Sequence, residues 1–384
     1  MSRRPRLERH DLVHGDGRRL LVYGALRGVL DPTATSSDEA ELHKRYDVLS
    51  DSWIAVSPSR NSRPNSSDSM DSDGTGDAAN ACSLCPGGPE IPFSYDAVVF
   101  ENRFPAFVAQ PPSVEGSFVG PSTGRCEVIV YTERHAGSLA TLTPDELARV
   151  VAIWRDRSSE LWADAEHRFV MVFENRGVVV GATISHPHGQ IYAFDHLPPT
   201  TALRASTALR HRAETGRCLQ CDLVARDEAS GDRRIVENDA FVVAVPFAAR
   251  WPYEVHVRAR RHGLRRLSDL DATEQQALAG ALRQVVVRYD GLFGFEMPYM
   301  MVAQEAPDGQ PDWHLSFEFL PPHRTAQLRK IPASVETATG LFINDTLPES
   351  SAAVLAGVPV GAATQEAIPP EVAVRTPGGS TVRG

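Results

Sequence analysis

The sequence predicts an α+β fold made of two copies of one unit, with antiparallel β-sheets and flanking helices. Three observations support this prediction. Each half begins with a Cys-x-x-Cys pair, Cys82/Cys85 and Cys218/Cys221; each continues through a strand to a histidine and an N-capped helix; and each ends in a second histidine. Because these features recur in the same order, we predict a duplicated unit rather than two unrelated domains.

Two long periodic stretches are predicted as helices, residues 143–163 and 271–293. Each begins with a capping residue, Thr143 or Asp271, followed after three positions by a glutamate that can complete a capping box. Strands are predicted from apolar runs at residues 97–100, 127–131, 169–173 and 241–245. Several of these are joined by short segments with Gly or Pro rather than by helices, so we expect antiparallel pairing.

Composition divides the chain into a folded body and weakly patterned flanks. We expect a weakly ordered N-terminal extension over residues 1–40, an N-terminal domain over 41–200, a C-terminal domain over 201–350 and a disordered tail over 351–384. Within the first domain, residues 65–81 are rich in Ser, Asp, Gly and Asn and are predicted to form a mobile loop.

The charge balance excludes some classes of partner. The 384 residues include 39 Lys and Arg against 49 Asp and Glu, a formal net charge of −10. This balance provides no sequence-wide field to attract nucleic acid or an anionic membrane. The chain also lacks an apolar run of membrane-spanning length, and its first residues lack the apolar segment of a secretory signal. We therefore expect a cytoplasmic protein with no nucleic-acid or membrane partner.

Reduced cysteines in that compartment are better explained as metal ligands or core residues than as disulfides. Thiolates and imidazoles in a Cys-x-x-Cys plus two-histidine set suit tetrahedral zinc, and four protein ligands leave no open position, so both sites would be structural. The alternative for either pair alone is surface thiols or a redox pair, and Cys126, unpaired in an apolar strand, is predicted to be a core residue. The predicted ligands are Cys82, Cys85, His135 and His186 in the first site and Cys218, Cys221, His262 and His314 in the second.

The segment most informative about chemistry is His186-Pro187-His188-Gly189-Gln190. If it is a strand, His186, His188 and Gln190 lie on one face, which places a metal-held histidine beside a second histidine. A neutral imidazole can attack phosphorus with one ring nitrogen while the other is held by a hydrogen bond. The alternative is that both histidines are metal ligands or are solvated.

Four further segments stand beside this one: His43-Lys44-Arg45-Tyr46, Trp53-Ile54-Ala55-Val56-Ser57-Pro58, the Cys82/Cys85 pair and Phe173-Glu174-Asn175-Arg176-Gly177. With these segments the sequence resembles the galactose-1-phosphate uridylyltransferases, a branch of the histidine-triad superfamily. The resemblance implies that His188 attacks the α-phosphorus of UDP-glucose, releases glucose 1-phosphate and passes the uridylyl group to galactose 1-phosphate, which gives UDP-galactose. Gln190 can donate a hydrogen bond to a phosphoryl oxygen but cannot deliver a proton, which favours transfer over hydrolysis.

The same resemblance assigns further roles. Lys330 and Glu336 match positions that contact the sugar phosphate from the partner subunit of a homodimer. The residues that match nucleotide or phosphate contacts are Arg60, Arg63, Asn102, Asn175 and Thr183. The alternative for the two arginines is that they are solvated surface charge, and the alternative for the two asparagines is that they are turn residues.

The second half departs from the enterobacterial pattern, which places histidines of a second, iron-type metal site where this sequence has Gln304, Ser316 and Glu318. Ser316 and Glu318 stand at the positions equivalent to His188 and Gln190, so we expect one active site per chain. Two other functions remain open: an ADP-sugar or dinucleoside polyphosphate phosphorylase or adenylyltransferase of the same superfamily, and a zinc-stabilised binding module.

Overall fold

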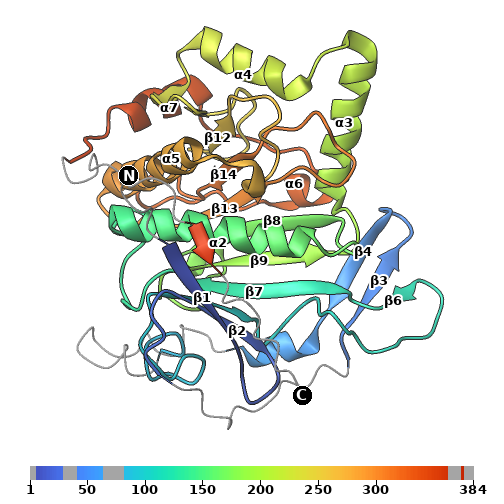
Figure 1. Cartoon of the computed structure of the whole chain (residues 1–384). Coiled ribbons are helices and arrows are strands. Elements are labelled where there is room, and N and C mark those ends of the chain that lie inside the picture. The colour runs from blue at the N-terminus through green and yellow to red at the C-terminus, as the bar shows by residue number, and fades with distance from the viewer. Residues whose placement is uncertain (1–5, 29–40, 64–81, 362–372, 376–384) are drawn as a thin grey trace.

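The computed structural model describes residues 6–28, 41–63, 82–361 and 373–375 (Figure 1). A single sheet of twelve strands runs through both halves in the order β10-β11-β12-β14-β13-β8-β9-β7-β5-β2-β1-β15. A separate sheet, β4-β3-β6, lies at one side of the molecule. The strands are β1 (Arg6–Val13), β2 (Arg19–Tyr23), β3 (His43–Asp47), β4 (Ser52–Val56), β5 (Ala97–Glu101), β6 (Val119–Gly120), β7 (Gly124–Val130), β8 (Phe169–Arg176), β9 (His188–Phe194), β10 (Arg234–Val236), β11 (Phe241–Ala244), β12 (Val255–Ala259), β13 (Tyr299–Gln304), β14 (Ser316–Leu320) and β15 (Ala373–Arg375).

The strand order confirms the predicted duplication. The first half contributes β5-β7-β9-β8, the second contributes β11-β12-β14-β13, and the two halves meet where β8 pairs with β13. Equivalent strands therefore stand at equal distances from the junction. All pairings within these eight strands are antiparallel, as predicted.

Two helices cover one face of the sheet, α2 (Pro144–Trp162) and α5 (Ala272–Phe293). Both predicted capping boxes are present, with Thr143 and Asp271 each accepting a hydrogen bond from the backbone of the glutamate three residues on. Trp154 of α2 stacks on Phe317 of β14 at 5.7 Å between ring centroids, so the core beneath the helices is continuous across both halves. Because α2 and α5 cover this face, a functional site on the sheet has to lie on the opposite face.

On that opposite face, which we call the outer face, the two halves differ. In the second half it is covered by α3 (Pro199–Thr215) and α4 (Leu219–Ser230), with Val224 of α4 packed on Val242 and Ala244 of β11. In the first half it is covered in part by residues 82–95, whose apolar side chains pack on β2, β5 and β7. Two short helices, α6 (Ser334–Thr339) and α7 (Pro348–Ala356), follow the last strand of the second half.

The terminal predictions need correction. The expected weakly ordered extension contains a hairpin, β1 and β2, which pairs with β5 and extends the large sheet. Its second strand is a short apolar run, Leu20–Tyr23, that follows a Gly-containing turn and is buried in the large sheet. Residues 351–356 of the predicted tail belong to α7, and β15 pairs in parallel with β1. The predicted loop over residues 65–81 lies outside the described residues.

Among the described residues, we find no helix with the length and apolar character to cross a membrane.

Candidate active site

The candidate nucleophile, His188, is the first residue of β9. The strand begins there and not before His186, so the expected period-two alternation applies to His188 and Gln190 but does not include His186. The Nδ1 atom of His188 lies 2.7 Å from the carbonyl oxygen of His186, so Nδ1 carries the proton and Nε2 carries the lone pair. Burial lowers the pKa of His188 below its usual value, which keeps the ring neutral and nucleophilic.

Gln190, two residues along the same strand, is oriented by its carbonyl oxygen. Oε1 accepts hydrogen bonds from Asn102 Nδ2 at 3.4 Å and from the Tyr192 hydroxyl at 3.3 Å. Both neighbours donate, so the amide nitrogen is the end that is left to donate. This is the orientation required for the predicted contact with a phosphoryl oxygen.

Gly189 lies between these two residues because no side chain fits there. A Cβ atom at Gly189 would collide with the hydroxyl of Tyr131 and press on the carbonyl of Phe173. That hydroxyl donates to Glu174 at 3.0 Å, and Tyr299 donates to the same carboxyl at 2.6 Å. Burial raises the pKa of Glu174, and the two hydroxyls oppose this shift. The nucleophile's strand thus rests on a buried cluster contributed by both halves.

His188 lies between two cavities, and it lines both together with Ile184. The larger, of about 290 Å³, has apolar walls from Leu84, Pro89, Phe100, Phe104 and Val128 and polar residues at Asn102, Thr183 and Gln190. We call it the nucleoside cavity, after the ligand that the resemblance to the uridylyltransferases predicts for it. The smaller, of about 140 Å³, is lined by residues that include Asn175, Arg176 and Glu296. We call it the second cavity.

The structure brings most of the predicted nucleotide contacts to these cavities. Arg63, Asn102 and Thr183 line the nucleoside cavity with His188, and Asn175 lines the second cavity. Arg60, in the 3₁₀ turn Pro58–Ser62, is oriented instead by the carbonyl of Phe104, to which its Nη1 donates at 3.1 Å. Arg60 therefore contacts a residue of the cavity wall but lines neither of the two cavities.

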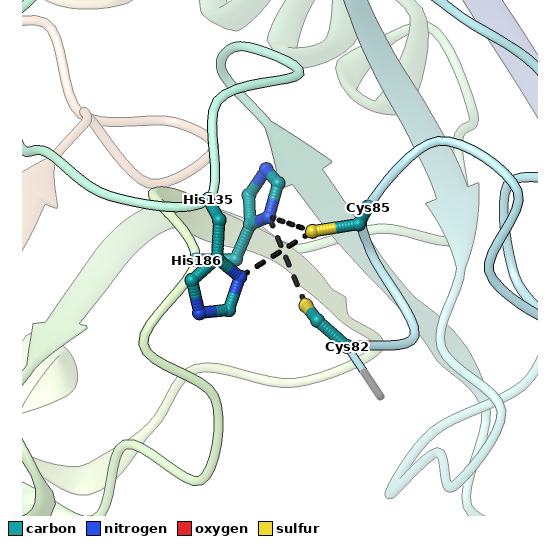
Figure 2. A group of neighbouring side chains, drawn as sticks. All are labelled: Cys82, Cys85, His135 and His186. Carbon is teal, nitrogen blue, oxygen red and sulfur yellow. Dashed lines mark hydrogen bonds between the residues drawn. The ribbon is translucent and has the colours of Figure 1, made fainter. Parts of the chain in front are cut away.

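The first predicted metal-ligand set is brought together in the structure (Figure 2). One nitrogen or sulfur atom from each of Cys82, Cys85, His135 and His186 lies within 4.8 Å of the others. His186 turns Nδ1 toward the thiols, while its Nε2 lies 2.8 Å from the Thr132 carbonyl. Two thiols and two imidazoles in this arrangement fit a tetrahedral metal, and the carbonyl fixes the orientation of the ligating ring.

The second set is assembled in the same way and is more open to solvent. Cys218, Cys221, His262 and His314 bring their ligand atoms within 4.8 Å. His314 uses Nε2, because its Nδ1 is held by the carbonyl of Ala259 at 2.7 Å. The His262 side chain is 51% exposed. Both clusters can therefore hold a metal ion, but only the first is enclosed.

The predicted sugar-phosphate contacts are not brought to His188 of the same chain, and the iron-type site is absent from the second half, as expected. Lys330 and Glu336 form a buried ion pair with each other, and neither lines a cavity at the nucleophile of the same chain. Glu318, which replaces one histidine of the iron-type site, is bound by Arg204 at 2.7 Å and Arg250 at 3.4 Å. Carboxylate held by arginines is not a metal-ligand set, and the described residues offer no third Cys/His/acidic cluster.

Comparison with known proteins gives this geometry a family. Residues 33–198 match the galactose-1-phosphate uridyl transferase N-terminal domain, and residues 205–365 match the C-terminal domain. The chain belongs to the galactose-1-phosphate uridylyltransferase family. A member from Thermotoga maritima is 37% identical over 318 residues, covering 80% of this chain and 96% of that protein. A member from Haemophilus influenzae is 31% identical over 310 residues, covering 77% and 88%.

Solved structures agree with membership of this uridylyltransferase family. A structure described as that of a uridylyltransferase is 28% identical, covers 84% of this chain and 98% of that one, and has a TM-score of 0.72. An ADP-glucose phosphorylase from Arabidopsis thaliana, with bound ADP-glucose, has a TM-score of 0.62 at 23% identity. The latter shows a shared fold.

Sequence reasoning missed several residues of this family member's site. Glu90 and Arg103 line the nucleoside cavity, and Tyr131 and Glu174 support the nucleophile's strand. Glu90 follows the Cys82/Cys85 pair closely, so its position near a metal turn was a usable indication. No local pattern marks the tyrosines, because their role depends on contacts between distant strands.

Proposed function

We propose that the chain transfers a uridylyl group from UDP-glucose to galactose 1-phosphate through a covalent intermediate on His188. The single observation that carries the proposal is the state of His188, whose Nδ1 is bound to the His186 carbonyl while its Nε2 is left to react between two cavities. A neutral imidazole with one committed nitrogen is an activated nucleophile that needs no further base.

The proposed reaction has two matching steps. His188 Nε2 attacks the α-phosphorus, the new P–N bond forms, and the bond to the bridging oxygen breaks so that glucose 1-phosphate leaves with its electron pair. A phosphate oxygen of galactose 1-phosphate then attacks the same phosphorus and returns the pair to Nε2. Both leaving group and acceptor are phosphates, so positioning and charge stabilisation can supply the catalysis.

Surrounding side chains have matching roles in the proposal. Gln190 donates its amide to a phosphoryl oxygen, while Arg63 and Thr183 offer donors in the nucleoside cavity. Asn175 would contact phosphate from the second cavity. Arg60 would support the wall through Phe104, and Asn102 both holds Gln190 and faces the nucleotide.

We further propose zinc as the metal of both clusters, because paired thiols and imidazoles favour zinc over cations that prefer oxygen ligands. Zinc would supply no open coordination position. In the first cluster it would fix His186, whose carbonyl orients His188. A reducing compartment such as the cytoplasm would keep the four thiols available as ligands.

A homodimer is proposed from the distribution of exposed apolar side chains. In and beside the β4-β3-β6 sheet these include Leu49 (95% exposed), Ile54 and Phe118, and near Lys330 in the sequence they include Ile331 (72% exposed) and Leu341. A contiguous exposed apolar patch is typical of a protein interface, so we propose that these side chains are covered in a dimer. A second copy covering them could bring Lys330 and Glu336 to the partner's sugar phosphate.

An isotope-exchange experiment tests the proposed uridylyl transfer. The protein should exchange labelled glucose 1-phosphate into UDP-glucose in the absence of galactose 1-phosphate, because the first step is reversible and complete in itself. Initial rates with both substrates should give parallel double-reciprocal lines. Absence of exchange, or equal turnover of ADP-glucose, would contradict the proposal and favour the phosphorylase or adenylyltransferase alternative.

Mixing inactive variants tests the shared site. Subunits carrying His188→Asn and subunits carrying Lys330→Met should each be weakly active alone. After mixing and subunit exchange, about a quarter of wild-type activity should appear, because half of the dimers are hybrids and each hybrid has one complete site. No recovery, with hybrid dimers present by native mass spectrometry, would show that Lys330 acts within its own chain or only in folding.

A further inference from the structure

The N-terminal hairpin β1–β2 precedes the region that matches the family's N-terminal domain, which starts at residue 33, yet its Arg18 contacts Glu90 in the wall of the nucleoside cavity. We propose that Glu90 in this cavity binds the ribose hydroxyls of the nucleotide, and that Arg18 of the hairpin is the positioning residue that holds Glu90. This inference rests on the proposed uridylyl transfer and adds a determinant of nucleoside specificity.

Glu90 is an almost buried carboxylate in a cavity wall. Its side chain is 9% exposed, and its Oε2 lies 2.9 Å from Arg18 Nη2. Although the two groups form an ion pair, Oε2 accepts no hydrogen bond of good geometry from the described residues. A carboxylate oxygen in this state has acceptor capacity left for a ligand, and a buried acceptor that stays unsatisfied is costly.

Arg18 is fixed by the hairpin itself. Its Nε donates to Asp16 at 2.7 Å, its Nη1 donates to the carbonyl of Glu101 at 2.9 Å, and Nη2 is thereby directed at Glu90. The side chain of Asp16 is 1% exposed, so this buried carboxylate in the hairpin turn restricts the orientation of the guanidinium. Three different directions of the planar group are thus in use, a geometry that lysine could not reproduce.

The backbone of Glu90 is held from the other side by the first metal cluster. Its N–H donates to Ser83 O at 3.3 Å, and Gly88 N donates to Cys85 O at 2.9 Å. A side chain at Gly88 would collide with the carbonyls of Cys82, Ser83 and Cys85. The loop is therefore wound tightly against the metal turn, and Glu90 cannot swing away from the cavity.

The chemistry of a carboxylate favours ribose as its ligand. An ionised carboxyl group only accepts hydrogen bonds, and the two adjacent hydroxyls of ribose offer it two donors. Uracil offers one N–H donor between two carbonyl acceptors, and these would repel the second carboxylate oxygen. Acidic side chains bind ribose hydroxyls for the same reason in other nucleotide sites.

The position of Glu90 relative to the reacting group is compatible with this role. Gln190 is hydrogen bonded to Asn102, the next residue is Arg103, and Arg103 Nη1 lies 3.9 Å from Glu90 Oε1. All four residues line one cavity with His188. In a uridylyl group bound to His188, ribose is the part that follows the phosphate.

The test compares UDP-glucose with 2′-deoxy-UDP-glucose. The wild-type protein should prefer the ribonucleotide by about tenfold or more in kcat/KM, the range of a hydrogen bond to a charged group. Glu90→Gln should reduce this preference to about threefold or less. Arg18→Ala should reduce it in part, and the double variant should match Glu90→Gln alone, because Arg18 acts through Glu90. Asp11→Asn, which removes a hairpin ion pair with Arg9 outside the cavity, should keep the wild-type preference.

Binding of UMP and 2′-deoxy-UMP measured by calorimetry gives the same comparison without turnover. An unchanged ribose preference in Glu90→Gln, or none in the wild type, would overturn the role of Glu90. A further loss in the double variant would overturn the positioning role of Arg18. Failure of the proposed transfer would be distinguishable, because the wild-type protein would then exchange no glucose 1-phosphate.

Discussion

The two halves have the same strand arrangement, but the side chains on their outer faces differ in charge. In the first half, Val130 and Val128 of β7 pair with His188 and Gln190 of β9. In the second half, the equivalent pairs on β12 and β14 are Arg258 with Ser316 and His256 with Glu318. Uncharged pairs therefore occupy the strand positions at His188, whereas charged side chains fill the matching place in the second half.

The consequence is visible in the contacts. Glu318 is bound by Arg204 from α3 and by Arg250, and Arg258 donates to Asp227 of α4 at 2.9 Å. Burial alone would raise the pKa of Glu318, but His256 and the two arginines outweigh it and lower the pKa to about 2. The ion pairs fasten α3 and α4 over the face. One copy of the unit thus keeps an open cavity, and the other became a closed support.

The largest expected effect is a loss of activity on substituting His188, in contrast to substitution of Ser316 at the equivalent position of the second half. His188→Asn should lower uridylyl transfer by at least about 10⁴-fold, because a covalent pathway is lost. Ser316→Ala, at the equivalent position, should leave kcat within about twofold of wild type, since surface and support positions away from the chemistry tolerate small changes. Steady-state assays on both purified variants check this. A large loss in Ser316→Ala would show that the second half takes part in the chemistry.

The next largest effect is expected from the two metal clusters, whose loss should affect kcat to different extents. Cys82→Ser should lower kcat by about 100-fold, since the enclosed cluster orients His186 and hence His188. Cys221→Ser, in the more exposed cluster, should lower the melting temperature while leaving most of kcat. Metal analysis should find about two zinc atoms in the wild type and about one in each variant. Equal loss of kcat in both variants at matched folding would contradict the difference in roles.

A smaller effect is expected on stability. Glu318→Gln should lower the free energy of unfolding by about 3 kcal/mol at pH 7, because two arginines lose a buried partner. The folded-state pKa of Glu318 is depressed, so its stabilisation is present above the unfolded value of about 4.3 and is lost as pH falls toward about 2. Urea unfolding between pH 3 and 7 should show a weaker pH dependence in the variant than in the wild type. Parallel curves would refute this role.

The sequence was informative wherever one residue type has one chemical use. Cysteine pairs, repeated histidines and capping boxes predicted both metal-ligand sets, both long helices and the duplication. The β1–β2 hairpin was missed because its apolar run is short and its first strand has no period-two pattern, while its place in the sheet comes from pairing with β5. Glu90 and the Tyr131–Glu174–Tyr299 cluster were missed because they are defined by contacts across strands and loops, which no local spacing records.

The most direct test of the account is the covalent intermediate itself. Incubation with UDP-glucose labelled in its uridylyl group, without acceptor, should attach close to one acid-labile label per wild-type chain, and peptide mapping should place it on His188. Adding galactose 1-phosphate should release the label as UDP-galactose, and a folded His188→Asn variant should take up none. Label retained in that variant, or found on another residue, would contradict the central claim.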